Sequence, residues 1–213
     1  MSARTFSPAD RIIGEIGRAI NVLYSEARPL RETPAASGGE LVLDEAARRE
    51  SSRLMRVNHA GEVAAQALYQ GQALTARDSA VSGAMRQAAS DEMDHLAWCE
   101  QRLRELNGRT SVLNPLWYAG SFAIGALAGA WGDRASLGFI TETERQVESH
   151  LRGHMERLPA GDARSRAILE QMTHDEVKHG ATAASLGGGE LPFWLRSAMR
   201  VTSRVMTRSS YWL

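Results

Sequence analysis

The amino-acid sequence predicts an all-α protein built around a four-helix bundle. Ala, Leu, Arg, Glu and Gln, which favour helices, are abundant, and β-branched residues do not alternate over any sustained stretch. In addition, a lone Glu followed about one helical hairpin later by Glu-x-x-His occurs twice in the chain. Four carboxylates and two imidazoles supplied in this way are typical of bundles that hold two metal ions.

Turn-forming residues divide the chain into six expected helices. Asp44 is placed to cap the first long helix, and Gly108 to end the second. Pro29 to Gly39 reads as a loop, because it is rich in Pro, Ser and Gly. The expected helices cover residues 8–27, 44–77, 79–107, 133–158, 162–187 and 192–213.

These elements predict three parts of the chain. Residues 1–43 form an N-terminal extension of one helix and a loop, and Ile12, Ile16, Ile20 and Leu23 share one face of that helix. The bundle covers 44–189 and includes a crossover without charged residues at 110–132. The last part, 190–213, is a basic amphipathic helix.

The composition excludes some classes of function. Its 25 basic and 25 acidic residues balance, so no overall charge attracts nucleic acid. The single cysteine, Cys99, cannot form an internal disulfide and is expected to be a small buried apolar residue. Residues 1–10 lack the basic start and apolar run of a secretory signal.

The doubled motif consists of Glu62 with Glu92-x-x-His95, and Glu144 with Glu176-x-x-His179. The lone Glu residues are offset by 82 positions (62 to 144), and the motif residues by 84 (92 to 176 and 95 to 179). Residues three apart lie on one helix face, so each motif presents an oxygen and a nitrogen to a metal ion.

Helix geometry supports a shared site. If the first hairpin turns near Asp78, Glu62 and Glu92 lie at one level, about 15 and 14 residues from the turn. If the second hairpin turns near Ala160, Glu144 and Glu176 each lie about 16 residues from the turn, on either side of it. The donor types suit iron, manganese or zinc. A single Glu-x-x-His also occurs by chance, so the matching offsets carry the prediction.

Other histidines are less informative. His59, one turn before Glu62, and His150 are candidates for orienting a ligand, although a buried, hydrogen-bonded His59 fits the pattern as well. His154 and His174 are expected on the surface.

Two more acidic residues lie close to Glu144. Glu148, one turn later, is a rival ligand on the same helix face. Glu142 is expected to face elsewhere. Residue spacing alone leaves the choice between Glu144 and Glu148 open.

The uncharged stretch at 110–132 is long enough to span a membrane. One crossing would place the two halves of the motif on opposite sides, so we expect this stretch to lie in the membrane interface or to pack on protein. Gly125 and Gly129 permit close approach of helices.

The C-terminal helix carries basic residues at four-residue spacing among aromatic and aliphatic ones, which suits an anionic membrane surface or a solvated face on the bundle. These basic residues are Arg196, Arg200, Arg204 and Arg208.

Five sequence blocks resemble the demethoxyubiquinone hydroxylases, the ferritin-like di-iron monooxygenases of ubiquinone synthesis, in their bacterial form. The blocks occur in order, and the similarity runs from about Arg53 to the C-terminus. They are Met55–Glu62, Asp91–Leu96, Asn114–Trp117, Thr143–Val147 and His174–His179.

The resemblance implies two iron ions per chain and chooses Glu144 over Glu148. It implies iron ligands at Glu62, Glu92, His95, Glu144, Glu176 and His179, with Glu92 and Glu176 bridging. Animal relatives have His-Tyr where this chain has His150-Leu151, so a role of that tyrosine does not carry over.

The implied reaction is the hydroxylation of a polyprenyl demethoxybenzoquinol with O₂ and two electrons. The electrons come from the quinol or from NADH, although the chain has no Gly-x-Gly-x-x-Gly nucleotide fingerprint. Because the substrate lives in the bilayer, we expect a peripheral protein on the cytoplasmic face of the bacterial membrane. Relatives can work with a lipid-binding accessory protein.

Three other functions share parts of the pattern. A ferritin-like iron-binding or ferroxidase protein has the same ligand set but no use for a membrane-seeking segment. A metal-free helical scaffold needs no ligands, and a manganese catalase holds manganese instead.

Overall fold

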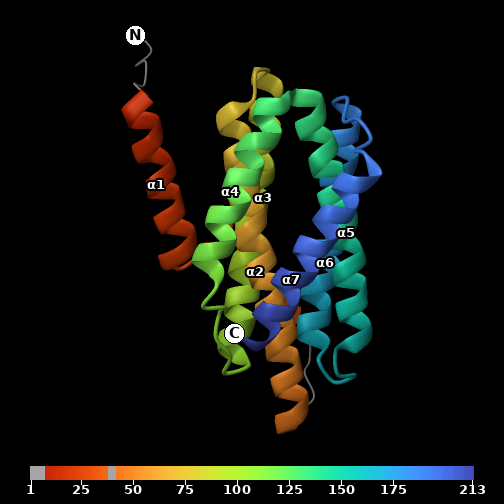
Figure 1. Cartoon of the computed structure of the whole chain (residues 1–213). Coiled ribbons are helices and arrows are strands. Elements are labelled where there is room, and N and C mark those ends of the chain that lie inside the picture. Colours follow the sequence, from red (N-terminus) through yellow and green to blue (C-terminus); the bar gives the residue numbers. More distant parts are fainter. Residues whose placement is uncertain (1–7, 38–41) are drawn as a thin grey trace.

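The computed structural model describes residues 8–37 and 42–213. Residues 1–7 and 38–41 lie outside it, and with them the start of the chain, where a signal was not expected, and the glycines that end loop 29–39. The described residues form seven α-helices and one 3₁₀ turn (Figure 1). The elements are α1 Pro8–Tyr24, η1 Pro34–Ser37, α2 Glu45–Thr75, α3 Ser79–Glu105, α4 Asn114–Trp131, α5 Asp133–Arg157, α6 Ala163–Ser185 and α7 Phe193–Trp212.

Two helical hairpins, α2–α3 and α5–α6, make the bundle (Figure 1). The second helix of each hairpin begins at an aspartate N-cap. The Asp78 side chain accepts a hydrogen bond from the backbone N–H of Ala80, and the Asp162 side chain accepts one from that of Ser165. Asp44 caps α2 as expected, by accepting from the N–H of Ala47. The all-α prediction is confirmed.

The end of α3 differs in detail from the expectation. The residue with positive φ is Asn107 (54°), and Gly108 follows it. Gly108 is needed for space, because a Cβ there would lie 2.1 Å from the hydroxyl of Ser52 on α2. Asn tolerates the left-handed conformation that ends a helix, so the turn comes one residue earlier than the glycine suggested.

The apolar segment forms α4, which packs along α2. A Cβ on Gly125 would lie 2.2 Å from the carbonyl oxygen of Leu68, and one on Gly71 would lie 2.3 Å from that of Phe122. The two backbones approach this closely because both positions are glycine. None of the described helices combines the length and apolar character needed to cross a membrane. The sequence argument against a single crossing agrees with this result.

Helix α1 lies beside α4 (Figure 1), and its four isoleucines are exposed. Ile12, Ile13, Ile16 and Ile20 are each more than half exposed, whereas Val22 is buried. The expected apolar face is therefore present on α1, but most of it does not contribute to the core.

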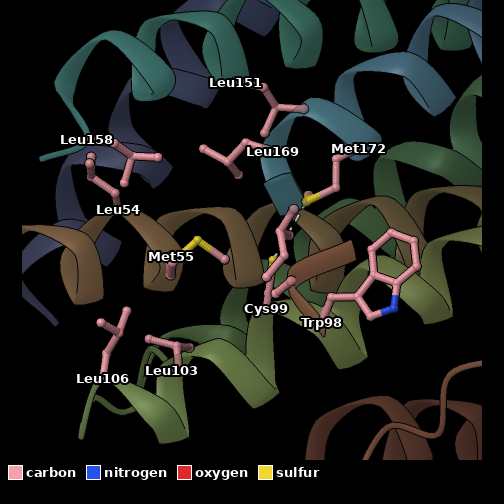
Figure 2. Packing of buried hydrophobic residues seen from close by; sticks show 12 residues of the cluster. Leu54, Met55, Trp98, Cys99, Leu103, Leu106, Leu151, Leu158, Leu169 and Met172 are labelled. Carbon is pink, nitrogen blue, oxygen red and sulfur yellow. Dashed lines mark hydrogen bonds between the residues drawn. The ribbon is translucent and has the colours of Figure 1, made fainter. Parts of the chain in front are cut away.

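Two apolar clusters lie at different levels of the bundle. The larger joins both hairpins through residues such as Leu54, Trp98, Leu151 and Leu169, and it also buries Cys99 (Figure 2). The smaller cluster, which includes Tyr69, Met85, Leu137 and Ala183, lies toward the other end. Along each bundle helix, the predicted ligands fall between a residue of one cluster and a residue of the other, so packed side chains close the site at both ends.

Candidate metal centre

The six predicted ligands come together inside the bundle. Their ligand atoms form two overlapping groups, in each of which all atoms lie within 4.8 Å of one another. One group is Glu62, Glu92, His95 and Glu176, and the other is Glu92, Glu144, Glu176 and His179. Glu92 and Glu176 belong to both groups, whereas each remaining residue belongs to one.

Both imidazoles direct Nδ1 toward the shared carboxylates. His95 Nδ1 lies 2.8 Å from Glu92 Oε2 and 3.5 Å from Glu176 Oε1. His179 Nδ1 lies 3.2 Å from Glu92 Oε1 and 3.4 Å from Glu176 Oε2. The level geometry expected from the hairpin turns is therefore present.

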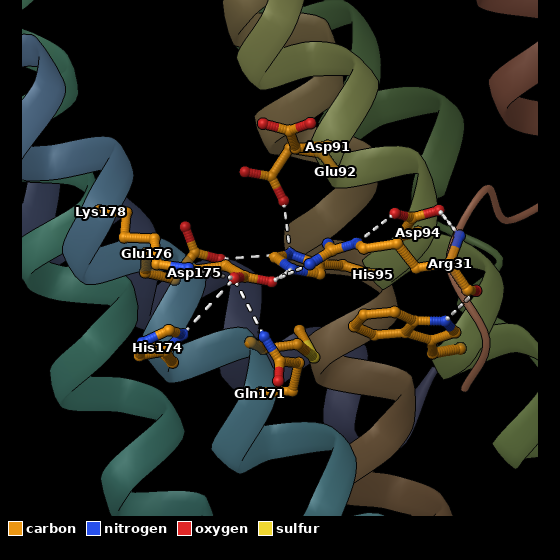
Figure 3. A network of polar contacts seen from close by, with 12 residues as sticks. Arg31, Asp91, Glu92, Asp94, His95, Gln171, His174, Asp175, Glu176 and Lys178 are labelled. Atoms are coloured by element: carbon orange, nitrogen blue, oxygen red, sulfur yellow. Dashed lines mark hydrogen bonds and ion pairs between the residues drawn. The ribbon is translucent and has the colours of Figure 1, made fainter. Parts of the chain in front are cut away.

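The other nitrogen of each imidazole meets an aspartate. His95 Nε2 lies 3.1 Å from Asp175 Oδ2, and His179 Nε2 lies 3.4 Å from Asp91 Oδ2 (His95 and Asp175 in Figure 3). A carboxylate at this nitrogen fixes the tautomer that leaves Nδ1 free for a metal. Sequence reasoning missed both aspartates, although each directly precedes the Glu of a motif and therefore signals an Asp-Glu-x-x-His repeat.

A loop residue, Arg31, also reaches this network and was not predicted. Its guanidinium donates to Asp94 and to Asp175, and Asp175 accepts a further bond from Gln171 (Figure 3). No spacing rule in the sequence connects Arg31 with residues on α3 and α6.

The pKa values of Glu62, Glu92 and Glu144 shift in different directions. Burial raises the pKa of Glu62 and of Glu144 well above the usual carboxylate range, and neighbouring carboxylates add to the shift. Burial also opposes ionisation of Glu92, but the attraction of His95 and the bonds from both histidines lower its pKa overall. The raised pKa values of Glu62 and Glu144 mean that, without a cation beside them, the fold favours the protonated, neutral forms of these two carboxyl groups.

The pKa values of both histidines are raised as well, although burial alone would lower them. Burial disfavours their charged forms, yet Glu92 and Asp175 raise the pKa of His95 well above its usual value. Hydrogen bonds that the imidazole donates to Glu176 and Glu92 raise the pKa of His179 to about 11. A metal ion must displace these protons, so its binding releases protons.

The donor set fits two iron ions. Carboxylate and imidazole are donors that iron accepts, and two divalent cations would offset four carboxylate charges. Glu144 Oε1 is a buried acceptor with no hydrogen-bond partner in the described part of the chain, as expected for an atom that binds a cation.

The rival ligand Glu148 lies outside the cluster, and so does Glu142, which was expected to face elsewhere. Glu148 forms an ion pair with Arg152 on the same helix, and Glu142 does so with Arg145. The choice of Glu144 agrees with this arrangement.

The remaining histidines divide into buried and exposed. His59 is buried and 3.3 Å from the amide nitrogen of Asn114. His150 is partly buried, and its ring centroid lies 3.9 Å from that of His154. No described contact joins His59 or His150 to the six residues, so an orienting role for either stays a prediction. The expectation for His154 was wrong: it is buried, and its Nδ1 lies 2.8 Å from Asn58 Oδ1, because the polar partner on α2 allows an imidazole in the core. His174 is exposed as expected.

Comparison with known proteins gives the family. Residues 49–210 match the family described as "Ubiquinone biosynthesis protein COQ7". The chain belongs to this family. Among its relatives, proteins from Azoarcus sp. (strain BH72), Cupriavidus necator and Nitrosococcus oceani are 54%, 55% and 52% identical to this chain, and all three are named 3-demethoxyubiquinol 3-hydroxylase. The alignments cover 95%, 95% and 100% of this chain and 98%, 99% and 100% of the relatives.

One solved structure agrees on the fold. A dodecameric thioferritin, the bacterioferritin-related protein from Bacteroides fragilis, superposes with a TM-score of 0.55 at 16% identity. The superposition covers 74% of this chain and 90% of the thioferritin chain. The family member described here therefore has the predicted ferritin-like fold.

Proposed function

We propose that this chain is a 3-demethoxyubiquinol 3-hydroxylase, an O₂-dependent monooxygenase that uses two iron ions and two electrons. The observation that carries the proposal is the pair of buried donor groups that share Glu92 and Glu176. Family membership and relatives with that name, aligned over nearly the whole chain, support the substrate. They do not favour the ferroxidase alternative.

Each residue of the site has a distinct task in this proposal. Glu92 and Glu176 contact both histidines and would bridge the two ions, while Glu62 and Glu144 would each complete one side. Iron held there would supply open coordination positions for O₂ and would pass on the two electrons that the reductant provides. Packed apolar residues at both ends of the site limit the entry of water.

A cavity between α1, α2 and α3 is our candidate for the quinol ring. It has a volume of about 920 Å³ and is lined by polar and apolar side chains, among them Gln66, Gln70 and Met93. Gln66 follows Glu62 by one helical turn. The Gln70 amide donates to the side-chain oxygen of Gln66 at 3.3 Å. Tyr118 in turn donates to Gln70. These amides would bind the ring oxygens, and the volume suits a headgroup with part of its tail.

Exposed apolar side chains on three helices support a peripheral position on the membrane. On α4, Leu116, Leu127 and Trp131 are at least 60% exposed. The isoleucines of α1 and the aromatic residues Phe193, Trp194 and Trp212 of α7 add to this surface. Such residues, with the arginines of α7, suit the cytoplasmic, anionic face of a bacterial membrane.

Two further partners belong to the proposal. The electrons would come from the quinol or from NADH, and a lipid-binding accessory protein would help to present the substrate. Reconstitution with each donor separately, with and without a lipid-binding partner, distinguishes these alternatives.

The decisive experiment supplies the reduced, iron-loaded protein with demethoxyubiquinol and ¹⁸O₂. We expect one labelled hydroxyl per product molecule, and Glu144→Ala should abolish it. If iron is oxidised rapidly while the quinol remains unlabelled, the ferroxidase alternative replaces this proposal.

Vesicle flotation tests the membrane position. The native chain should float with anionic vesicles, and Leu127→Glu with Trp131→Glu should reduce the bound fraction. Equal flotation of both proteins would remove α4 from the membrane surface.

A further inference from the structure

Arg31 lies outside the four-helix bundle, in the loop between α1 and η1, yet it reaches the surroundings of the candidate metal centre (Figure 3). Its Nη1 donates to Asp175 Oδ2 at 2.8 Å. The same oxygen lies 3.1 Å from His95 Nε2. One carboxylate oxygen therefore joins the guanidinium to the imidazole, whose other nitrogen faces Glu62, Glu92 and Glu176.

The position of Arg31 is itself fixed by several contacts. Its Nε donates to Asp94 Oδ2 at 2.6 Å, and the backbone N–H of Leu30 donates to Asp94 Oδ1 at 2.6 Å. The guanidinium carbon lies 4.9 Å from the ring centroid of Trp98, whose indole N–H donates to the carbonyl of Arg31 at 3.3 Å. A planar guanidinium can donate to two carboxylates and stack on an indole at once, which an ammonium cannot do.

The second imidazole lacks this support. Its aspartate, Asp91, is 39% exposed at the side chain and lies 3.4 Å from His179 Nε2. Gln87 donates to Asp91 at 2.9 Å. Within residues 8–37 and 42–213, no arginine forms an ion pair or a hydrogen bond with Asp91. The two related halves of the site therefore differ in what holds the aspartate behind the imidazole.

We propose that Arg31 is a positioning residue that selectively strengthens metal binding on the His95 side of the centre. It holds Asp175 in the orientation that keeps His95 Nδ1 directed at the glutamates. Such outer contacts contribute about 10- to 100-fold in metal affinity at other sites. The inference rests on the proposed metal site but not on the quinol chemistry, and it gives the N-terminal extension a role in the centre.

The test measures cobalt(II) binding to each half separately. His179→Gln leaves the donor group that contains His95, and His95→Gln leaves the group that contains His179. Arg31→Met is added to each background, and Co²⁺ affinity is read from the visible absorption of the bound ion. We expect Arg31→Met to weaken binding by about 10-fold or more when His95 remains, and by less than about 2-fold when His179 remains.

Two further variants separate positioning from general stability. Arg157→Met is the matched control, because Arg157 also joins a carboxylate, Glu50, to an aromatic ring, Tyr211, but away from the centre. It should leave the Co²⁺ affinity unchanged. Arg31→Lys should restore the affinity only in part. Thermal melts of the metal-free proteins show whether each variant is folded.

The outcomes are distinct. Unchanged Co²⁺ affinity in Arg31→Met, or an equal loss in both backgrounds, overturns the proposal. A selective loss supports it even if labelled product never appears in the ¹⁸O₂ experiment, which tests the hydroxylase proposal separately.

Discussion

The two halves of the candidate metal centre share a sequence pattern but not their surroundings. His95 is fully buried and its aspartate is tied to a loop arginine, whereas the side chain of His179 is 12% exposed and its aspartate lies near the surface. Glu92 and Glu176 belong equally to both halves. A repeated ligand motif therefore does not imply two equivalent metal positions, because the residues behind the ligands come from unrelated parts of the chain.

Removal of a shared carboxylate should have the largest effect. Glu92→Ala or Glu176→Ala is expected to lose both metal ions and to lower hydroxylation by ~100-fold or more, because each carboxylate serves both halves. Glu62→Ala and Glu144→Ala should each retain one ion. Iron per chain, measured by elemental analysis, checks the difference. Equal iron content in all four variants would show that the halves do not bind separately.

The aspartates behind the imidazoles should differ in importance. Asp175→Asn is expected to weaken metal binding by about 10- to 100-fold, and Asp91→Asn by less, because water can replace a half-exposed carboxylate. Titration of the metal-free proteins with Co²⁺ gives both affinities. A larger effect at Asp91 would reverse the comparison between the halves.

A third comparison concerns α4, which packs closely along α2 of the first hairpin. Gly125→Ala should destabilise the protein by about 1–3 kcal/mol, because its Cβ would meet the carbonyl of Leu68. Gly120→Ala on the same helix meets nothing within 4 Å. It should stabilise by up to about 1 kcal/mol through helix propensity. Urea unfolding of both variants measures these changes in the free energy of unfolding. If both substitutions stabilise the protein, or both destabilise it, the close approach of α4 to α2 at Gly125 is contradicted.

Three histidines outside the metal-ligand cluster should make stability depend on pH. Burial lowers the pKa of His59 and of His150 to about 4, and that of His154 to about 2. Between about pH 6.5 and 4 the unfolded chain gains protons that the folded chain does not, so the free energy of unfolding should fall as the pH falls.

A single substitution can assign part of this pH dependence to one residue. Between pH 7 and 5, the free energy of unfolding should fall by roughly 1–2 kcal/mol less in His150→Gln than in the native chain. The control is His174→Gln, at an exposed position, and its free energy of unfolding should fall as much as that of the native chain. Urea unfolding at the two pH values checks this. If the free energy of unfolding of His150→Gln falls as much as that of the native chain, His150 is not held neutral in the fold.

Much of the bundle could be predicted because its information is local. Helix periodicity, aspartate caps and two matched hairpins are enough to bring Glu62, Glu92, Glu144 and Glu176 to one level. The family resemblance then selected Glu144, and the ion pair of Glu148 with Arg152 agrees with it.

The unpredicted features depend on contacts between distant segments. Arg31 meets Asp175 across 144 residues, and His154 is buried because Asn58 on α2 supplies a partner. The outward direction of the isoleucines on α1 likewise depends on which surface the helix meets. Spacing within one segment shows that a face exists but does not identify its partner.

The contacts of Arg31 also bear on the order in which the chain folds. Arg31 is made early in synthesis, but its partners lie 63 and 144 residues later, on α3 and α6. Closing loops of this length has an entropic cost that two ion pairs alone do not recover, so the loop can dock only after the hairpins have paired. The loop that contains Arg31 is thus translated early but docks late, after both hairpins have formed.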